Sequence, residues 1–143
     1  MKKIIKYLVL PFIILLSSCG PMISKFEVET QEGINEPIKI SREDYDLMIN
    51  EEKSFILYIA LTTCGSCKKF SENALNPFIK ESNVIIYRIE AYHIDDAINY
   101  IATPAISIIK EGEVINTVNM LDDGKYFTSK KSFKKFIDRY ITY

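Results

Sequence analysis

The hydrophobic residues of this chain are grouped in short stretches, each about as long as a β-strand. The stretch at 55–61 is almost continuously apolar, which is typical of a central strand covered on both faces. A second strong strand is predicted at 84–89, and two more at 105–109 and 114–118. The last two are joined at 111–113, a span short enough for a hairpin around Gly112.

Helical patterns alternate with these strands. Ser41 is a good N-cap for a helix through about Glu51. A second helix is predicted to begin near Cys64 and to kink or break at Pro77, because proline has no backbone N–H to donate. Further helices are expected at 94–101 and 129–140, where apolar residues recur at helical spacing. Alternating strands and helices predict an α/β layer architecture.

The N-terminus has a pattern of its own. A basic region at 1–6 is followed by an uncharged apolar run at 7–16. This run is too short to cross a bilayer, which takes about twenty apolar residues. A basic region followed by a short apolar core is the pattern of a secretory signal, so residues 1–18 are expected to be a signal peptide.

The apolar run ends in Leu16-Ser17-Ser18-Cys19, which resembles the bacterial lipobox. The resemblance implies that Cys19 is lipidated, with palmitate among the possible acyl chains, and becomes the mature N-terminus. Several acyl chains would hold the protein stably at a membrane. We therefore expect a lipoprotein on the extracytoplasmic side of a bacterial cell membrane. The alternative is a soluble secreted protein in which Cys19 is incidental.

Beyond Cys19 the chain divides into two parts. Residues 19–37 are mixed in composition and are expected to be a tether, although a short first strand within them is compatible with the pattern. Residues 38–143 form the predicted domain. The net charge of the whole chain is -1, and without the three lysines of the signal it is 15 - 19 = -4. This balance argues against a nucleic-acid partner.

Two cysteines three positions apart, Cys64 and Cys67, lie where the 55–61 strand passes into a helix. The helix N-terminus stabilises an anion and lowers the pKa of a thiol there, which predicts that Cys64 is the nucleophile. Cys67, one turn inside the helix, would attack the resulting mixed disulfide and release the substrate. Cys67 is therefore the predicted resolving thiol.

Three other interpretations of this pair compete. A structural zinc site normally needs four ligands, and the remaining candidates are only Cys19 and His93, so no metal is expected. A purely structural disulfide closing so small a loop would remove little entropy from the unfolded chain. Coincidence is the third, because a CxxC motif alone is weak and depends on its context.

The context resembles the thioredoxin family over about 37–143. A buried strand leads into Cys64-Gly65-Ser66-Cys67 and a helix, Thr103-Pro104 precedes a later strand, and a hairpin and an amphipathic helix follow. The resemblance implies a thioredoxin-like fold with a central mixed sheet flanked by helices. It also implies that Pro104 is cis, that Thr103 and Pro104 bind an extended substrate, and that Thr63, Gly65 and Ser66 form the active-site loop.

The sequence also departs from thioredoxins proper. Thr63 and Ser66 replace the tryptophan and proline that flank the family's cysteines, and the chain has no tryptophan. Tyr58 stands where thioredoxin has a buried aspartate, so the usual proton acceptor for Cys67 is missing. With an ordinary pKa near 10, Tyr58 would be a poor base. Water, Glu72 or another nearby carboxylate could replace it.

These features predict a membrane-anchored thiol–disulfide oxidoreductase that exchanges disulfides with protein substrates through Cys64 and Cys67. It would need no cofactor, would work with a redox partner protein, and would be a monomer. The pattern is compatible with either an oxidant or a reductant. The alternative is a non-enzymatic lipoprotein that uses the fold as a binding or assembly module.

Overall fold

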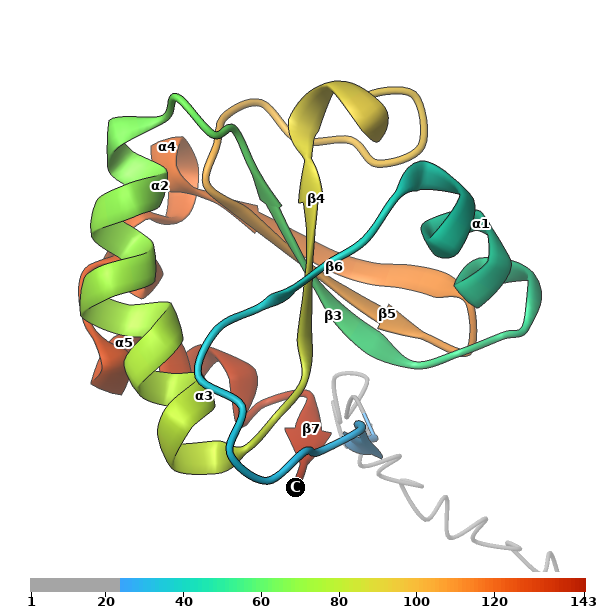
Figure 1. Cartoon of the computed structure of the whole chain (residues 1–143), viewed down its shortest axis with the longest axis horizontal. Helices are drawn as coiled ribbons and strands as arrows, with labels where there is room; N and C mark the ends of the chain where they lie inside the picture. Colours follow the sequence, from blue (N-terminus) through green and yellow to red (C-terminus); the bar gives the residue numbers. More distant parts are fainter. Residues whose placement is uncertain (1–23) are drawn as a thin grey trace, which may run out of the picture.

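The computed structural model describes residues 24–143, which form a mixed β-sheet flanked by helices (Figure 1). Three strands run parallel to one another, and the last two are antiparallel to their neighbours. In spatial order the strands are β2 (Ile38–Lys39), β4 (Ile86–Glu90), β3 (Phe55–Ala60), β5 (Ala105–Lys110) and β6 (Glu113–Asn119). The four strands expected from the apolar pattern are confirmed, and so is the predicted fold class.

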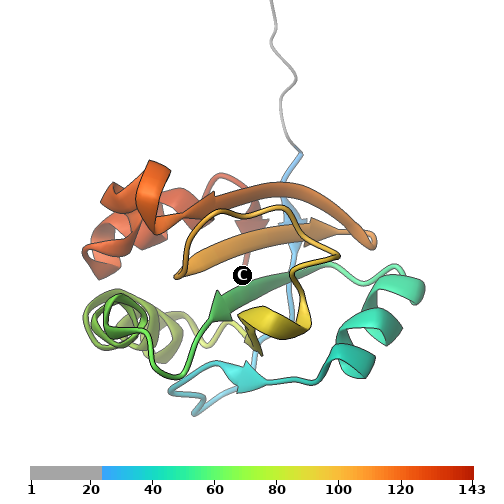
Figure 2. The same ribbon diagram turned by 90° about the horizontal axis from the view of Figure 1, so that it is seen from above.

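Helices cover both faces of the sheet (Figure 2). One face carries α2 (Gly65–Phe70), α3 (Asn76–Ser82) and α5 (Lys130–Ile137), and the other carries α1 (Arg42–Asn50). The short α4 (Met120–Asp123) follows β6. Along β3 the side chains alternate between the two cores, and all of them are buried, as the continuous apolar run predicts.

The helix that follows the two cysteines changes its geometry before the proline. Between α2 and α3 the chain widens into a π-helical segment, Ser71–Leu75, and Pro77 lies in the first turn of α3. Proline cannot donate a backbone hydrogen bond, and a π-helical turn is one way for a helix to accommodate this. The predicted kink or break at Pro77 therefore takes the form of a change in helical winding.

The hairpin between β5 and β6 turns at Glu111 and Gly112, which have φ angles of 52° and 77°. Glycine is required at the second position for more than its backbone angle. A Cβ atom on Gly112 would lie 2.6 Å from the carbonyl oxygen of Ile49, at the end of α1. The Gly112 N–H also donates to the carbonyl oxygen of Lys53 at 3.0 Å, so the hairpin packs tightly on the loop that follows α1.

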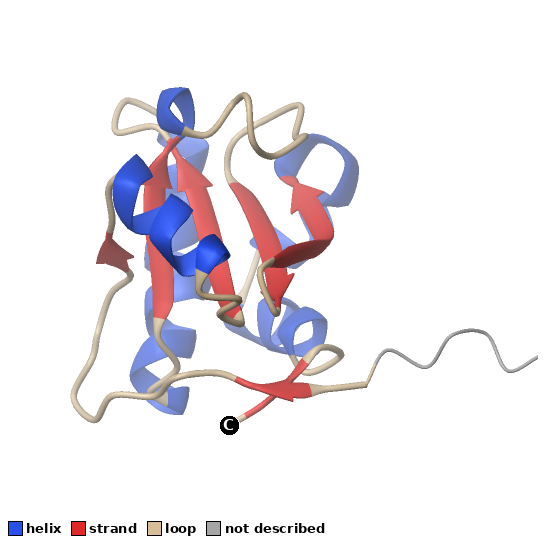
Figure 3. Ribbon diagram, turned by 90° about the vertical axis from the view of Figure 1, so that its right-hand side faces the viewer, coloured by secondary structure: helices blue, strands red, loops and turns tan. Residues whose placement is uncertain are grey.

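The part of the expected tether that the structure describes packs against the domain. β1 (Phe26–Glu27) pairs in parallel with β7 (Ile141–Thr142), and Thr30 forms a bridge with Val84. Phe26 is buried in the core cluster that also contains α5. Figure 3 shows the two short strands crossing below the main sheet. The segment therefore begins its contacts with the domain well before residue 38.

The helix expected at 94–101 does not form. A short 3₁₀ segment at Ala91–His93 is followed by turns and then by bends as far as Pro104. Ile94 and Ile98 are buried as their helical spacing predicts, but Ile101 is 62% exposed. One helical turn suffices to bury the two isoleucines. The helix does not continue to Pro104, because helical geometry is disfavoured for the residue before a proline.

Candidate redox site

The two cysteines lie where β3 ends and α2 begins, as the sequence predicts. Cys64 is the N-cap of α2, with extended backbone angles, and the backbone N–H of Cys67 donates to Cys64 Sγ at 3.1 Å. The sulfur therefore occupies the place that an oxygen usually takes at an N-cap, where it meets unpaired backbone donors. This environment stabilises a thiolate at Cys64 when the pair is reduced.

Cys64 and Cys67 form a disulfide. The two cysteines differ in their exposure, because Cys67 is 3% exposed whereas Cys64 is only partly buried. An incoming sulfur therefore reaches Cys64 more readily than Cys67. The difference fits the roles predicted from the sequence, in which Cys64 attacks first and Cys67 resolves.

The Thr103–Pro104 peptide bond is cis and lies beside the disulfide. β5 is antiparallel to β3, so the first residue of β5 lies at the same end of the sheet as the last residue of β3. The Thr103 hydroxyl donates to Cys64 Sγ at 3.6 Å. The structure thus brings together residues that are 39 positions apart in the sequence.

The active-site loop adds a further hydroxyl. Ser66 Oγ lies 3.1 Å from Cys64 Sγ and donates to the Thr103 carbonyl oxygen at 3.4 Å. A loop serine in place of the family's proline therefore places a hydroxyl directly beside the sulfur. Thr63 and Gly65 are exposed on the same loop, and a Cβ on Gly65 would meet no atom within 4 Å.

Tyr58 is buried beneath the resolving cysteine. Its hydroxyl donates to the Cys67 carbonyl oxygen at 3.2 Å and lies 3.3 Å from Ser71 Oγ, in the first turn of the π-helical segment. Burial raises the pKa of Tyr58 above its ordinary value. Tyr58 therefore stays protonated at neutral pH and acts as a hydrogen-bond donor that fixes the helix backbone.

A cleft of ≈ 360 Å³ is lined by both Cys64 and Cys67. Its walls come from several elements, and Glu36 is the one carboxylate among the residues that line it; the others include Lys39, Tyr58, Ser71, Asn76 and Arg88. Asn76 Oδ1 is buried, and no protein donor among the described residues reaches it. Buried acceptors of this kind are usually satisfied by water, and the cleft that Asn76 lines also reaches Cys67.

Glu72, the replacement for the missing aspartate that the sequence suggested, lies elsewhere. Its side chain is 59% exposed and points to Lys68 at 4.0 Å, one helical turn before it. It does not line the cleft beside Cys67. The local carboxylate at that cleft is Glu36, which comes from the segment that the sequence pattern treats as tether.

Sequence reasoning also missed Glu90, the last residue of β4. This side chain is 3% exposed and accepts hydrogen bonds from Thr62, in the loop just before Cys64. The signal in the sequence is a single carboxylate that directly follows the apolar run at 84–89. Charged residues are rarely buried without a partner, so such a position can be singled out once the strand is recognised.

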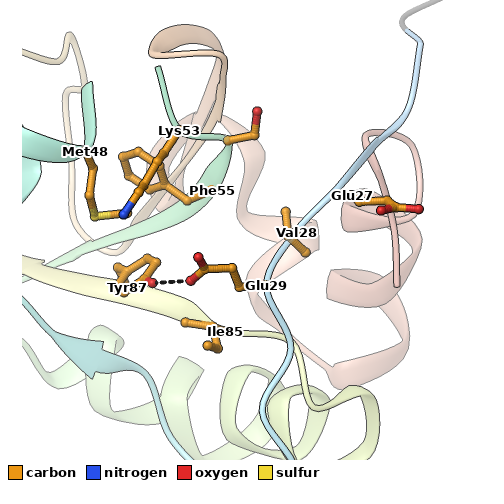
Figure 4. A pocket seen from close by; sticks show the side chains of 9 residues that line it. Glu27, Val28, Glu29, Met48, Lys53, Phe55, Ile85 and Tyr87 are labelled. Carbon is orange, nitrogen blue, oxygen red and sulfur yellow. Dashed lines mark hydrogen bonds between the residues drawn. The ribbon is translucent and has the colours of Figure 1, made fainter. Parts of the chain in front are cut away.

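A second pocket, of ≈ 330 Å³, lies at the other end of β3 (Figure 4). The rings of Phe55 and Tyr87 meet edge to face within it, at a centroid distance of 5.9 Å. The Tyr87 hydroxyl donates to Glu29 Oε2 at 2.8 Å. Burial, and then this hydrogen bond, raise the pKa of Tyr87 to about 12.

Two further predictions concern metals and membranes. Across residues 24–143, no group of three or more His, Cys, Asp or Glu side chains is arranged to hold a metal ion. No helix in that range is long and apolar enough to cross a membrane. The predicted signal peptide at 1–18 and the predicted lipidation site Cys19 lie outside the described residues.

Comparison with known proteins shows which fold this is. No protein-family model and no curated protein matches the chain. Oxidized thioredoxin O1 from Arabidopsis thaliana is 19% identical, with a TM-score of 0.52, over 71% of this chain and 97% of that chain. Thioredoxin from Trypanosoma brucei brucei is 14% identical, with a TM-score of 0.57, over 78% and 99%. A putative oxidoreductase with a thioredoxin fold is 16% identical, with a TM-score of 0.51, over 69% and 91%. The chain therefore has the thioredoxin fold.

Proposed function

We propose that this protein is a thiol–disulfide oxidoreductase that exchanges disulfides with protein substrates through Cys64 and Cys67. The observation that carries the proposal is the Cys64–Cys67 disulfide at the N-terminus of α2, with Thr103 beside Cys64 Sγ. The fold supports it, because the similar solved structures include thioredoxins.

The chemistry is a pair of exchange reactions. In the reducing direction, the Cys64 thiolate attacks one sulfur of a substrate disulfide, forms a mixed disulfide and expels the other sulfur as a thiolate. Cys67 then loses its proton and attacks Cys64 Sγ. This closes the Cys64–Cys67 disulfide and expels the remaining substrate sulfur as a thiolate. The reverse sequence oxidises a substrate dithiol, and a redox partner protein restores the starting state.

We also propose that the protein is anchored through a lipid on Cys19, on the extracytoplasmic side of a bacterial membrane, and works as a monomer. The N-terminal sequence pattern supports the proposed anchor. Ser24 Oγ accepts a hydrogen bond from Lys110 Nζ at 2.8 Å, at the end of β5. Ser24 thus lies at the end of the sheet opposite Cys64, an arrangement compatible with an anchor that leaves the redox pair accessible.

Exchange is tested with Cys64→Ser in the full chain. Because the serine hydroxyl is not ionised at neutral pH and forms no disulfide, we expect insulin reduction and dithiol oxidation to fall to the uncatalysed rate. Cys19→Ser is the matched control, since it also removes one cysteine but leaves the redox pair intact. Unchanged activity of Cys64→Ser would exclude Cys64 as the nucleophile, and a wild-type rate no higher than the uncatalysed one would favour a non-enzymatic binding module.

Anchoring is tested by labelling cells that produce the full chain with a clickable palmitate analogue and then separating membranes from soluble protein. We expect Cys19→Ala to lose the label and leave the membrane fraction, since the thioether and the new N-terminus both require this cysteine. Cys64→Ala, which removes a different cysteine, should keep both. Labelling that survives Cys19→Ala would contradict the proposed anchor.

A further inference from the structure

Glu90 is the one charged residue among the buried side chains of the described chain, and it is 3% exposed. It ends β4 and lies directly across from Ala60, which ends β3. The loop that leads to the redox pair begins immediately after Ala60. A buried carboxylate is thus placed next to the only stretch of chain that connects β3 to Cys64.

Both oxygens of this carboxylate are occupied. Oε2 accepts the backbone N–H of Thr62 at 3.1 Å, and Oε1 accepts the Thr62 hydroxyl at 2.7 Å and Arg88 Nη2 at 2.8 Å. Two of the three donors belong to one residue of the loop. Glu90 therefore binds Thr62 through two hydrogen bonds, one from the Thr62 backbone and one from the Thr62 side chain.

The carboxylate is held in its charged form. Burial acts to raise the pKa of Glu90, but hydrogen bonds from Thr62 and the positive charges of Arg88 and Lys39 outweigh burial and keep the pKa below its ordinary value. Hydrogen bonds to a charged acceptor are stronger than neutral ones. A buried ion pair is weak evidence for a role in stability alone, since apolar side chains often serve as well.

The next residues along the loop are those that place the nucleophile. The Cys64 backbone N–H donates to the Leu61 carbonyl oxygen at 3.1 Å, so the position of Cys64 depends on the residues beside Thr62. Cys64 Sγ in turn meets the Cys67 N–H, the Ser66 hydroxyl and the Thr103 hydroxyl at 3.1 to 3.6 Å. Hydrogen bonds weaken steeply as distance and angle depart from their optimum.

We propose that Glu90 is a positioning residue of the redox site, which holds Thr62 and thereby keeps Cys64 Sγ within reach of the Cys67 N–H and the Thr103 hydroxyl. The inference rests on the proposed function only in taking the Cys64 thiolate as the reactive group. Glu90 acts through the loop, because its hydrogen bonds go to Thr62 and Arg88 and to neither cysteine.

Glu90→Gln tests this proposal because the amide replaces one acceptor oxygen with an NH₂ group that faces a donor. The readout is the Cys64 pKa, taken from thiolate absorbance near 240 nm in the reduced full chain. We expect the Cys64 pKa to rise by about 0.5 to 1 unit, because its thiolate loses well-aligned donors. An effect through charge alone has the opposite sign, since removing a nearby negative charge favours the thiolate. A fall in the Cys64 pKa would therefore overturn the proposal.

Thr62→Val closes a double-mutant cycle by removing the hydroxyl that Glu90 accepts. If Glu90 acts through Thr62, the double variant should shift the Cys64 pKa no further than Glu90→Gln does alone. Shifts that add would mean that Glu90 acts by another route. Glu90→Asp supplies a second check, because it keeps the charge on a shorter side chain and should behave like the glutamine variant.

Ile109→Val is the matched control for general loss of stability. Ile109 is fully buried at the far end of β5 and pairs with Phe55. We expect this variant to lower the melting temperature without moving the Cys64 pKa. A shift in Ile109→Val as large as that in Glu90→Gln would reduce Glu90 to a structural residue. None of these readouts uses substrate turnover, so they remain decisive even if Cys64→Ser shows that the protein is not an oxidoreductase.

Discussion

The two ends of the β3 strand are held together in different ways. At its carboxyl end, side-chain hydrogen bonds converge on the loop and the disulfide, and they involve Thr62, Ser66 and Thr103. At its amino end, the chain is fastened by backbone pairing of β1 with β7 and by packing of rings such as Phe78 against Tyr143. The comparison teaches that substitutions at the first end should change chemistry, whereas substitutions at the second should change stability.

The largest effect is expected from Cys67→Ser at the redox end. Its serine cannot attack the mixed disulfide, so turnover should stop while the first exchange continues. Cells or extracts should then yield the protein covalently linked to its substrates, visible as reducible bands on non-reducing gels. Melting of the variant should stay close to that of the reduced wild type. Failure to trap any mixed disulfide, with Cys64 still present, would contradict the division of roles between the two cysteines.

Phe78→Ala should produce the largest effect at the other end. Phe78 is 1% exposed and meets Phe133 edge to face at 5.2 Å. Removing so large a buried side chain typically costs about 3–5 kcal/mol of unfolding free energy. Urea denaturation measures this loss, and Phe78→Leu should show a smaller one. The Cys64 pKa should not move in either variant; if it does, the two ends are coupled and the comparison fails.

A smaller effect is expected from Tyr87→Phe in the pocket of Figure 4. The folded-state pKa of Tyr87 is about 12, above the ordinary value near 10. A raised pKa means that its contribution to stability is present below pH 10 and is lost as the pH rises through 12. Melting temperatures between pH 9 and 12 should therefore fall more steeply for the wild type than for Tyr87→Phe. Parallel curves would show that the hydroxyl contributes nothing through its ionisation.

Much of the redox site could be predicted from sequence because its signals are local. An apolar run, two cysteines and the Thr103-Pro104 pair each carry their own pattern, and the fold then brings them together. The features that escaped prediction depend on long-range contacts. β1 pairs Phe26 with Ile141, and nothing in either short segment marks the other as its partner. Isoleucines at 94 and 98 are compatible both with a full helix and with a single helical turn that buries them, so the pattern does not distinguish the two.

The pairing of β1 with β7 also limits how far the domain could lie from the proposed membrane anchor. The Phe26 N–H donates to the Tyr140 carbonyl oxygen at 3.0 Å, so the two ends of the described chain are joined. The proposed tether therefore ends at Phe26 instead of Pro37. Its fully extended length is shorter by about 35 Å, at roughly 3.3 Å per residue. Removing the last few residues of the chain would remove β7, the partner of β1. The tether would then be longer, and the cysteines could reach substrates over a larger volume.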